Sequence, residues 1–383
     1  MKNAAITPYL AGTVASTTGS IATFGIAIAG LSAMGASQSQ TATAIVAMLV
    51  GYGVLSIGLS IWLKMPISIV WSTPGAAFLA TSSGLGVEFQ TAVGAFIVSS
   101  LLVVLTGAWP ALSRLIAKIP PQISAAMLAG VIFPFVAATV HSSVNFPTLI
   151  IPVIVIWLML NRLLPLWASP IAIVIGFALI AVSQEAKSFE VLSFWPSLEM
   201  ISPVFDIGVI VAIGIPLYLI SMASQNLPGL AIMSALGYPL PTSKIFVATG
   251  IGSVMTSLFG GFGLNLAAIT AALNADEGAG KEPSKRWKAA AWGGVVYLIF
   301  ALFASVFAAF VLAVPRELLL ALAGLALIKT FASSLRTAVS DESTRLAGVV
   351  TFVIGAAGIS VFGIGGAFWA LVSGILVWSI RTR

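Results

Sequence analysis

The stretch WSTPGAAFLA, residues 71–80, decides how the chain folds, because it places helix-starting residues inside a very apolar sequence. We predict Thr73 as an N-cap and Pro74 as the first helical residue, where the missing N–H group of proline costs nothing. A helix over 74–83 would be about 15 Å long, roughly half of a ~30 Å hydrocarbon core. The preceding residues, PISIVW (66–71), are predicted to cross the other half as extended chain.

The composition shows which class of protein could contain such a segment. Of the 383 residues, 59% are hydrophobic and only 7% are charged, whereas a soluble domain carries roughly 25% charged residues. The apolar runs are long and continuous, as in 148–160 and 293–314, and differ from the short alternating segments of membrane β-barrels. We therefore predict an all-α polytopic membrane protein.

Several functional classes are excluded at the same time. The chain has no Cys and a single His, His141, so thiol nucleophiles, disulfides and Cys/His zinc sites are ruled out. No intramembrane metal set or His/carboxylate pair suggests an enzyme. We expect no cofactor, no metal and no nucleic acid.

Splitting the chain at Pro, Gly and charge clusters predicts about fourteen membrane segments in two sets of seven. The first set lies near 12–33, 41–63, 67–83, 91–109, 121–140, 146–161 and 166–183. The second set lies near 207–236, 244–259, 264–275, 288–312, 316–332, 345–361 and 363–380. Residues 184–206, between the sets, are the one stretch with an ordinary charge density.

This count divides the positive charges very unevenly between the two sides of the membrane. Of the 17 Lys and Arg residues, Lys187 and Arg316 fall on one side and all the others fall on the opposite side. Positive residues concentrate in cytoplasmic loops. We therefore predict a multi-pass protein of the inner membrane with both termini in the cytoplasm.

A weak internal repeat relates the two sets of segments. PQISAAMLAG (121–130) and PRELLLALAG (315–324) share Pro and the final Leu-Ala-Gly, and each begins the fifth segment of its half. Because seven is odd, the second half runs through the membrane upside down relative to the first. The sequence thus predicts the inverted-repeat architecture of secondary transporters.

The third segments of the two halves look alike in this arrangement. In the second half GGFG (260–263) is predicted to be extended, and LNLAAITAALNA (264–275) is predicted to form another half-length helix. The N-termini of the two half-helices would face each other near the midplane, where their unpaired N–H groups and positive partial charge suit an anion. A simple Pro kink in a full-length helix is the alternative.

The membrane segments carry no Asp or Glu in their interiors. All 11 Asp and Glu residues fall in predicted loops or at segment ends. Amides, hydroxyls and helix N-termini suit an anion, which buried carboxylates would repel. Nearby Phe259, Phe262 and Met222 suit an aromatic ring. The predicted substrate-binding residues are Ser72, Thr73, Pro74, Gly75, Ser224, Gln225, Asn226, Gly263, Leu264, Asn265 and Thr270.

For some of these residues a structural role is an open alternative. Gln225 and Asn226 are costly to expose to lipid, so they face either a cavity or another helix. Pro228, which comes just after them, is expected to loosen the helix there and free carbonyl groups of the preceding turn. Tyr52, Gln122 and Ser16–Thr17–Thr18 are weaker candidates. His141, at the outer end of the fifth segment, is interpreted as a solvated loop residue.

Four motifs carry a resemblance to a known family: TPGAAFLA (73–80), PPQISAAMLAGVIF (120–133), SQNLPGLAIM (224–233) and GGFGLNLAAITAA (260–272). The chain resembles the fold shared by nucleobase permeases and sulfate- and bicarbonate-type anion transporters. More specifically it resembles the benzoate/proton symporter family of bacterial inner membranes.

The resemblance implies a core of segments 1–4 and 8–11, a gate of segments 5–7 and 12–14, and substrate bound between them. The corresponding ranges are 1–110 for the first-repeat core, 111–201 for the first-repeat gate with the connector, 202–313 for the second-repeat core and 314–383 for the second-repeat gate. The membrane lipid is a further partner. The oligomeric state, monomer or homodimer, stays open.

The implied function is secondary-active import of a small aromatic carboxylate with proton symport, by alternating access. No membrane carboxylate would carry the proton, so either the substrate brings its own proton or Asp276 or Glu277 takes part. The alternatives are a transporter of the same fold for an inorganic anion or a nucleobase, or an uncoupled anion channel. Nucleobase permeases of this fold carry glutamates in segments 8 and 10, which this chain lacks.

Overall fold

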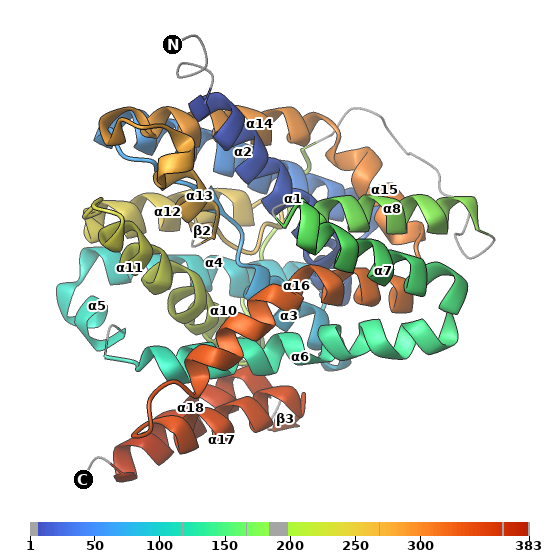
Figure 1. The fold of residues 1–383 in the computed structure, drawn as a ribbon. Helices are drawn as coiled ribbons and strands as arrows, with labels where there is room; N and C mark the ends of the chain where they lie inside the picture. The colour runs from blue at the N-terminus through green and yellow to red at the C-terminus, as the bar shows by residue number, and fades with distance from the viewer. Residues whose placement is uncertain are drawn as a thin grey trace.

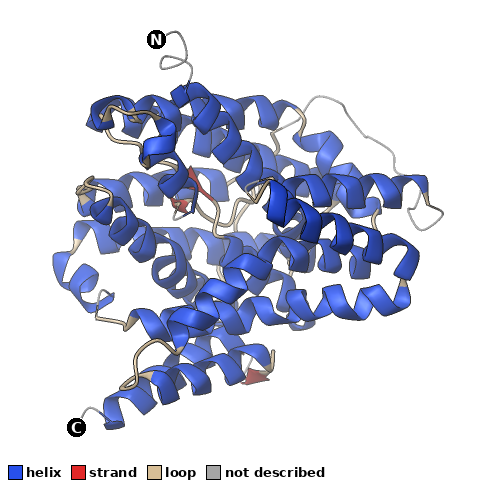
Figure 2. Cartoon of the chain, in the orientation of Figure 1, coloured by secondary structure: helices blue, strands red, loops and turns tan. Residues whose placement is uncertain are grey.

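The computed structural model describes residues 7–116, 118–165, 167–183, 198–267, 269–361 and 364–381, which are mostly helical (Figures 1 and 2). Most of the predicted connector, 184–197, lies outside the described residues. Through residue 182 the elements are α1 (Thr7–Ala33), α2 (Gln38–Leu63), β1 (Ile69–Val70), α3 (Thr73–Thr81), α4 (Phe89–Ala108), α5 (Pro110–Ile116), α6 (Pro121–Asn145), α7 (Pro147–Leu163) and α8 (Ala168–Val182).

The elements after residue 206 include a long helix that changes character along its length. They are α9 (Ile207–Val209), η3 (Ile210–Gly214), α10 (Ile215–Ser221), η4 (Met222–Asn226), α11 (Leu227–Ala235), α12 (Thr242–Ser257), β2 (Asn265–Leu266), α13 (Ile269–Ala275), α14 (Trp287–Leu302), α15 (Ala304–Ala313), α16 (Arg316–Ala338), α17 (Arg345–Ala356), β3 (Ser360–Val361), β4 (Ile364–Gly365) and α18 (Gly366–Arg381).

Within the described ranges, six helices are long and apolar enough to cross a membrane. They are α1, α2, α4, α6, the continuous helix Ile207–Ala235 and α16. A seventh crossing results if Pro283–Leu302 and Ala304–Ala313, which meet at an angle of 62°, form one span. The apolar helices α7, α8, α17 and α18 are shorter. The chain is thus a helical protein with several membrane-length apolar helices, as the composition predicts.

Local sequence signals explain where several helices begin or change geometry. Ser37 and Gln40 form a reciprocal capping box at the start of α2. The π-helical turns η3 and η4 each lie just before a proline, Pro216 and Pro228, which supplies no N–H group to the preceding turn. The expected loosening of the helix before Pro228 is therefore present.

Two short strands from distant parts of the chain pair with each other. β1 and β2 are antiparallel, with Ile69 opposite Leu266 and Val70 opposite Asn265. The nine-residue α3 follows β1, and the seven-residue α13 follows β2. The predicted helix start at 264 is wrong, because pairing with β1 holds this stretch extended and the helix begins only at Ile269.

The helices pack in two groups that share contacts at a few places. In one group α2 contacts α14, α4 contacts α12, and α1 contacts α3 and α14; in the other, α6 contacts α16 and α17, and α17 contacts α18. Figure 1 shows α2 and α14 at one edge of the molecule, α17 and α18 at the opposite edge, and α6 and α16 between them. Contacts of α1 with α8 and α16, and of α3 with α6, join the groups.

Small residues allow the closest of these approaches, as in many membrane proteins. A Cβ atom on Gly324 of α16 would lie 1.9 Å from the Phe135 carbonyl oxygen of α6. A Cβ atom on Gly130 of α6 would lie 2.8 Å from the Phe352 carbonyl oxygen of α17. Gly130 and Gly324 are the final residues of the two repeated motifs, so the repeat preserves positions of close helix contact.

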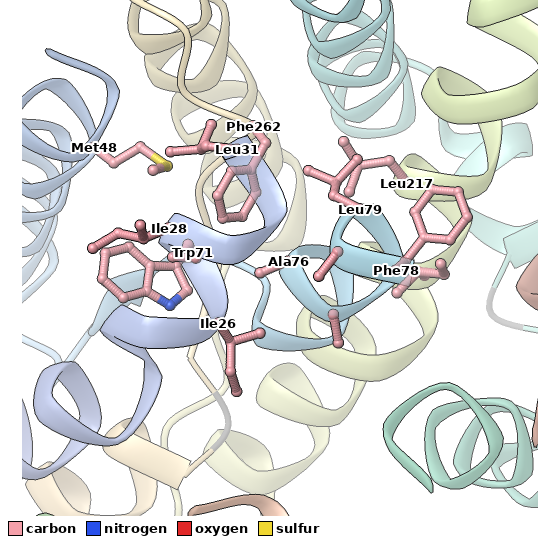
Figure 3. Packing of buried hydrophobic residues seen from close by; sticks show 14 of the residues in the cluster. Ile26, Ile28, Leu31, Met48, Trp71, Ala76, Phe78, Leu79, Leu217 and Phe262 are labelled. Carbon is pink, nitrogen blue, oxygen red and sulfur yellow. The ribbon is translucent and has the colours of Figure 1, made fainter. Parts of the chain in front are cut away.

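The buried apolar core surrounds α3. Figure 3 shows Trp71 and Phe78 on opposite sides of Ala76, with Ile28 beside Trp71. All four side chains are almost completely buried. The Gly75 position is equally tight, because a Cβ atom there would meet Leu217 at 2.7 Å. The short helix predicted from the sequence is thus enclosed by protein over most of its length.

Candidate substrate-binding site

A cavity of about 540 Å³ lies between the two groups of helices. It extends from the start of α3 to Pro165, in the α7–α8 connection, and to Lys329 and Ser333 of α16, which are exposed. The cavity therefore opens to the surface at this end. Its hydroxyl and amide lining residues are Thr18, Ser20, Thr23, Tyr52, Thr73, Ser169, Gln225, Thr270, Tyr297, Thr330 and Ser333.

Three aromatic side chains form one wall of the cavity. The ring of Tyr52 lies 5.3 Å from Trp71 and 5.4 Å from Tyr297, measured between centroids. The indole N–H group of Trp71 donates to the Thr23 hydroxyl at 2.9 Å, which holds the indole in one orientation. α6 and α16 contribute the apolar residues Leu128 and Leu327, and α16 also contributes Lys329, Thr330 and Ser333. An aromatic ring could therefore bind between the three aromatic side chains and the apolar residues of α6 and α16.

The start of α3 differs from the prediction in one respect. The N-cap is Ser72, whose hydroxyl accepts from the Gly75 N–H group at 3.0 Å, and Thr73 is already helical. The Ala76 N–H group donates to the Ser72 carbonyl oxygen. Since Pro74 has no N–H group, the first turn offers at most the N–H group of Thr73 to a ligand. The expected set of unpaired amides is thus mostly absent here.

This cap predicts that substitutions of two neighbouring residues differ in their effect on stability. A Ser72→Ala variant loses the cap and should lose about 1 kcal/mol of stability. A Thr73→Val variant leaves the cap in place and should unfold at the same temperature as the parent. Thermal unfolding of the detergent-solubilised protein measures both. Equal unfolding temperatures for Ser72→Ala and the parent would contradict the assignment of the cap.

The three polar residues of the eighth segment lie in π-helical η4 and have different surroundings. Gln225 lines the cavity. Ser224 is buried and donates to the Ile220 carbonyl oxygen at 2.6 Å. Asn226 is completely buried, and its Oδ1 atom accepts from the Leu266 N–H group at 3.0 Å. Asn226 therefore has the structural role that the sequence left open as an alternative: its side chain connects η4 to β2.

The residues predicted from the tenth segment also differ in whether they line the cavity. Thr270 lines the cavity, whereas Gly263, Leu264 and Asn265 are not among its lining residues. The Leu264 N–H group donates to the Ser253 hydroxyl at 2.7 Å, so this stretch is held against α12. Of the eleven predicted residues, the structure brings Thr73, Pro74, Gln225 and Thr270 to the cavity. Ser72 and Gly75 support the first turn of α3 from outside it.

Some of the other residues proposed from the sequence line the cavity and others do not. Tyr52 and Thr18 line the cavity, and Gln122 does not. His141 is exposed on α6, inside a helix and not in a loop. Phe262 packs against Phe96 at 6.4 Å and takes no part in the lining. The aromatic lining comes from other residues, Trp71 and Tyr297, and no sequence signal separates them from the remaining aromatics.

Charged groups are sparse at the cavity. Among the described residues, Lys329 is the one charged residue in the lining, and its ammonium group donates to the Pro165 carbonyl oxygen at 2.6 Å. The described Asp and Glu residues lie in connections or at helix ends, and Asp276 and Glu277 are exposed. Among the described residues, no group of three or more His, Cys, Asp or Glu could hold a metal ion. The lining can therefore attract an anion, and its described residues include no negatively charged group that would repel one.

Comparison with known proteins agrees with this arrangement. Residues 2–380 match the family model described as benzoate membrane transport protein. The inner membrane protein YdcO of Escherichia coli (strain K12) is 36% identical over 341 residues, covering 89% of this chain and 87% of that protein. The benzoate membrane transport protein of Acinetobacter baylyi (strain ATCC 33305 / BD413 / ADP1) is 29% identical over 341 residues, covering 88% and 85%.

Two of the solved structures with a similar fold are anion transporters. The transmembrane domain of the cyanobacterial bicarbonate transporter BicA superimposes with a TM-score of 0.60 at 17% identity, covering 96% of this chain and 97% of that one. Murine Slc26a9, in the inward-facing state, gives a TM-score of 0.60 at 12% identity, covering 100% and 70%. The family and these neighbours are membrane transporters and not enzymes. The resemblance seen in the four sequence motifs is confirmed, and the chain belongs to the benzoate membrane transport protein family.

Proposed function

We propose that this protein is a secondary-active transporter that carries a small aromatic carboxylate and a proton across the bacterial inner membrane by alternating access. The observation that carries the proposal is the cavity between the two groups of helices, whose lining combines three aromatic side chains, several hydroxyl groups and apolar residues such as Leu128 and Leu327. Its volume of about 540 Å³ is within the range of small-molecule sites. The named relative from Acinetobacter baylyi points to benzoate.

The helix contacts support an inverted repeat of seven segments. In such a repeat each segment corresponds to the one seven places later, so that α2 corresponds to α12, α4 to α14, α7 to α17 and α8 to α18. The α2–α14 contact then has its counterpart in the α12–α4 contact, and the α7–α8 contact has its counterpart in α17–α18. Likewise, the α1–α8 contact has its counterpart in the α10–α18 contact. The contacts α6–α16 and β1–β2 map onto themselves. We infer fourteen segments, in which β1 with α3 and β2 with α13 each make one crossing.

The same contacts support a core and a gate. In this proposal the core comprises 1–110 and 202–313, and the gate comprises 111–201 and 314–383. The group containing α2, α4, α12 and α14 is the core, and the group containing α6, α16, α17 and α18 is the gate. Lining residues come from both, so a movement of one group against the other would carry a bound substrate or change its exposure.

Contacts between positively charged loops support the predicted orientation. Lys64 lies 4.3 Å from the ring centroid of Trp287, and Lys244 lies 5.0 Å from that of Trp62. These pairs join connections that the orientation places together in the cytoplasm. Lys329, at the open end of the cavity, belongs to the same predicted side. We infer that both termini are cytoplasmic and that the cavity is open inward.

On the predicted outer side of the membrane, a contact joins the two groups of helices. Arg316, at the start of α16, donates to the Ala80 carbonyl oxygen at 3.4 Å and the Ser83 hydroxyl at 3.3 Å, at the end of α3. This contact joins the proposed gate to the proposed core on the outer side. Opening outward would have to break it, which is compatible with an inward-open arrangement.

The proton is proposed to travel on the substrate. The lining contains no carboxylate among the described residues, and Asp276 and Glu277 are exposed and outside the cavity. Hydroxyl groups can both donate and accept, so one set of hydroxyls can hold a carboxylate and the neutral acid. The alternative role of Asp276 or Glu277 therefore has less support.

Uptake of labelled benzoate into proteoliposomes, with and without an inside-alkaline pH gradient, tests the function. We expect gradient-driven uptake above that of protein-free liposomes, which measure passive entry of the neutral acid. A Gln225→Ala variant should lose most of this uptake while keeping the parent's unfolding temperature. Uptake of sulfate, bicarbonate or uracil in place of benzoate would overturn the substrate. Flux that ignores the gradient would identify a channel.

The single charged lining residue gives a salt-dependent prediction. A Lys329→Met variant keeps the length of the side chain but removes its attraction for an incoming anion. We expect benzoate binding to weaken about fivefold at low ionic strength, equivalent to roughly 1 kcal/mol, and the loss to shrink as salt screens the charge. Titration at several salt concentrations measures this. Lys244→Met, away from the cavity, is the matched control, and an equal loss there would contradict the prediction.

A further inference from the structure

In the part of the chain that the structure describes, three hydroxyl groups of cavity-lining residues are buried without a hydrogen-bond partner. They belong to Thr18 of α1, Tyr52 of α2 and Tyr297 of α14, all of which line the cavity. Tyr52 is 1% exposed and Tyr297 is 2% exposed. Buried polar groups are nearly always paired, so three unpaired hydroxyls in one lining require an explanation.

Other polar groups lie close to these hydroxyls. The Tyr297 hydroxyl lies beside the hydroxyls of Ser16 and Thr270, and the Tyr52 hydroxyl lies beside the main chain of Trp71. The rings of Tyr52 and Tyr297 are 5.4 Å apart, so their positions are fixed relative to each other. By contrast, the buried Tyr218 hydroxyl and the Thr106 hydroxyl are 2.6 Å apart and form a hydrogen bond. Ser16, beside Tyr297, also has a buried hydroxyl without a partner, and unpaired polar atoms of Thr41, Asn265 and Asn274 lie outside the lining.

We propose that the hydroxyls of Thr18, Tyr52 and Tyr297 bind the carboxyl group of the transported acid. This inference rests on the proposed function and assigns the polar contacts to α1, α2 and α14, in place of the α3 N-terminus. A carboxylate has about four lone-pair sites and can accept all three hydroxyls. Trp71, Leu128 and Leu327 then enclose the ring.

The chemistry of the three groups favours an anionic oxygen over water. In a cavity of this size the partner of a free hydroxyl is either water or a ligand. A hydrogen bond to an ionised acceptor is shorter and about twice as strong as one between neutral groups. Buried hydroxyls carry no charge, so leaving them unpaired in the empty site costs less than burying an unpaired charged group would.

The test measures binding and stability together in full-length protein in lipid nanodiscs. Isothermal titration gives the dissociation constants for benzoate and for its neutral isostere benzamide, and thermal unfolding without ligand gives stability. For Tyr52→Phe and Tyr297→Phe we expect benzoate to bind about ten- to a hundredfold more weakly, with a smaller change for benzamide. Thr18→Val should show the same preference for weakening benzoate.

Stability separates a binding role from a structural one. Removing a buried hydroxyl that has no partner should leave the unfolding temperature unchanged or raise it. The control Tyr218→Phe removes a hydroxyl that is hydrogen-bonded to Thr106, whose own hydroxyl donates to the Leu102 carbonyl oxygen, so the loss of this bond should lower the unfolding temperature without changing the affinity for benzoate. Unchanged benzoate affinity in both tyrosine variants at the cavity would overturn the inference. Equal weakening of benzoate and benzamide together with a lower unfolding temperature would overturn it as well.

The outcomes also distinguish this inference from the proposed function. If the parent binds benzoate and the variants bind it equally well, the function stands and the hydroxyl site is wrong. If the parent binds bicarbonate or sulfate but not benzoate, and the tyrosine variants lose that anion, the hydroxyl site stands and the substrate is wrong.

Discussion

A Gly324→Val variant should fail to form the stable contact between α6 and α16. A Cβ atom at this position would lie 1.9 Å from the Phe135 carbonyl oxygen and 2.4 Å from the Thr139 hydroxyl. The Thr139 hydroxyl already donates to the Ala321 carbonyl oxygen at 2.8 Å, so the two helices would have to separate and break this bond. Forcing extra atoms into such a contact costs about 3 kcal/mol or more. We expect little folded protein in detergent and an unfolding temperature far below that of the parent.

The same substitution elsewhere in a helix provides the control. Gly58 of α2 is exposed, and a Cβ atom there would meet no atom within 4 Å. Gly58→Val should therefore unfold close to the parent temperature and give a similar yield in size-exclusion chromatography. A stable Gly324→Val protein would show that α6 and α16 do not approach as closely as described.

Replacing Asn226 by Ala should destabilise the protein, although this residue does not line the cavity. Its Oδ1 atom accepts from the Leu266 N–H group, and its Nδ2 atom lies 3.3 Å from the Met222 sulfur. The variant leaves the buried N–H group of β2 without a partner, which costs roughly 2–3 kcal/mol. Because Leu266 pairs with Ile69 beside α3, we expect transport to fall together with the unfolding temperature.

Comparison with the neighbouring residue tests this assignment. Gln225→Ala changes the cavity lining and should lower uptake without lowering the unfolding temperature. The two variants have to be measured separately, since a double variant would mix a binding effect with a folding effect. If Asn226→Ala lost uptake but unfolded at the parent temperature, Asn226 would be a binding residue, as the sequence alone predicts.

The positions of most helices follow from local sequence. α6 begins at Pro121, α16 begins at Arg316 directly after Pro315, and the long apolar runs of α2 and α4 form helices close to their predicted limits. Proline at a helix start and continuous apolar runs act within a few residues, so they are readable without knowledge of the fold. The prediction that α3 is a short helix rests on the same kind of signal.

The tenth segment shows where local reasoning stops. Residues 264–268 have apolar side chains apart from Asn265, and nothing in this short run distinguishes a helix from an extended chain. Partners distant in sequence decide the matter: Ile69 and Val70 pair with this stretch, Asn226 accepts from Leu266, and Ser253 accepts from Leu264. Each of these contacts depends on the completed fold.

The sequence by itself determined the class of protein, the approximate positions of the apolar helices, the family and the absence of Asp and Glu from the interiors of the membrane segments. These features depend on composition and on signals between near neighbours. Only the tertiary structure decided which polar groups meet at the cavity. Thr18, Tyr52 and Tyr297 come from three helices, and Gln225 and Asn226 are adjacent in sequence but have different surroundings. The physical reason is that the direction of a side chain and its partners depend on how helices pack, and that packing is set by contacts between residues far apart in the chain.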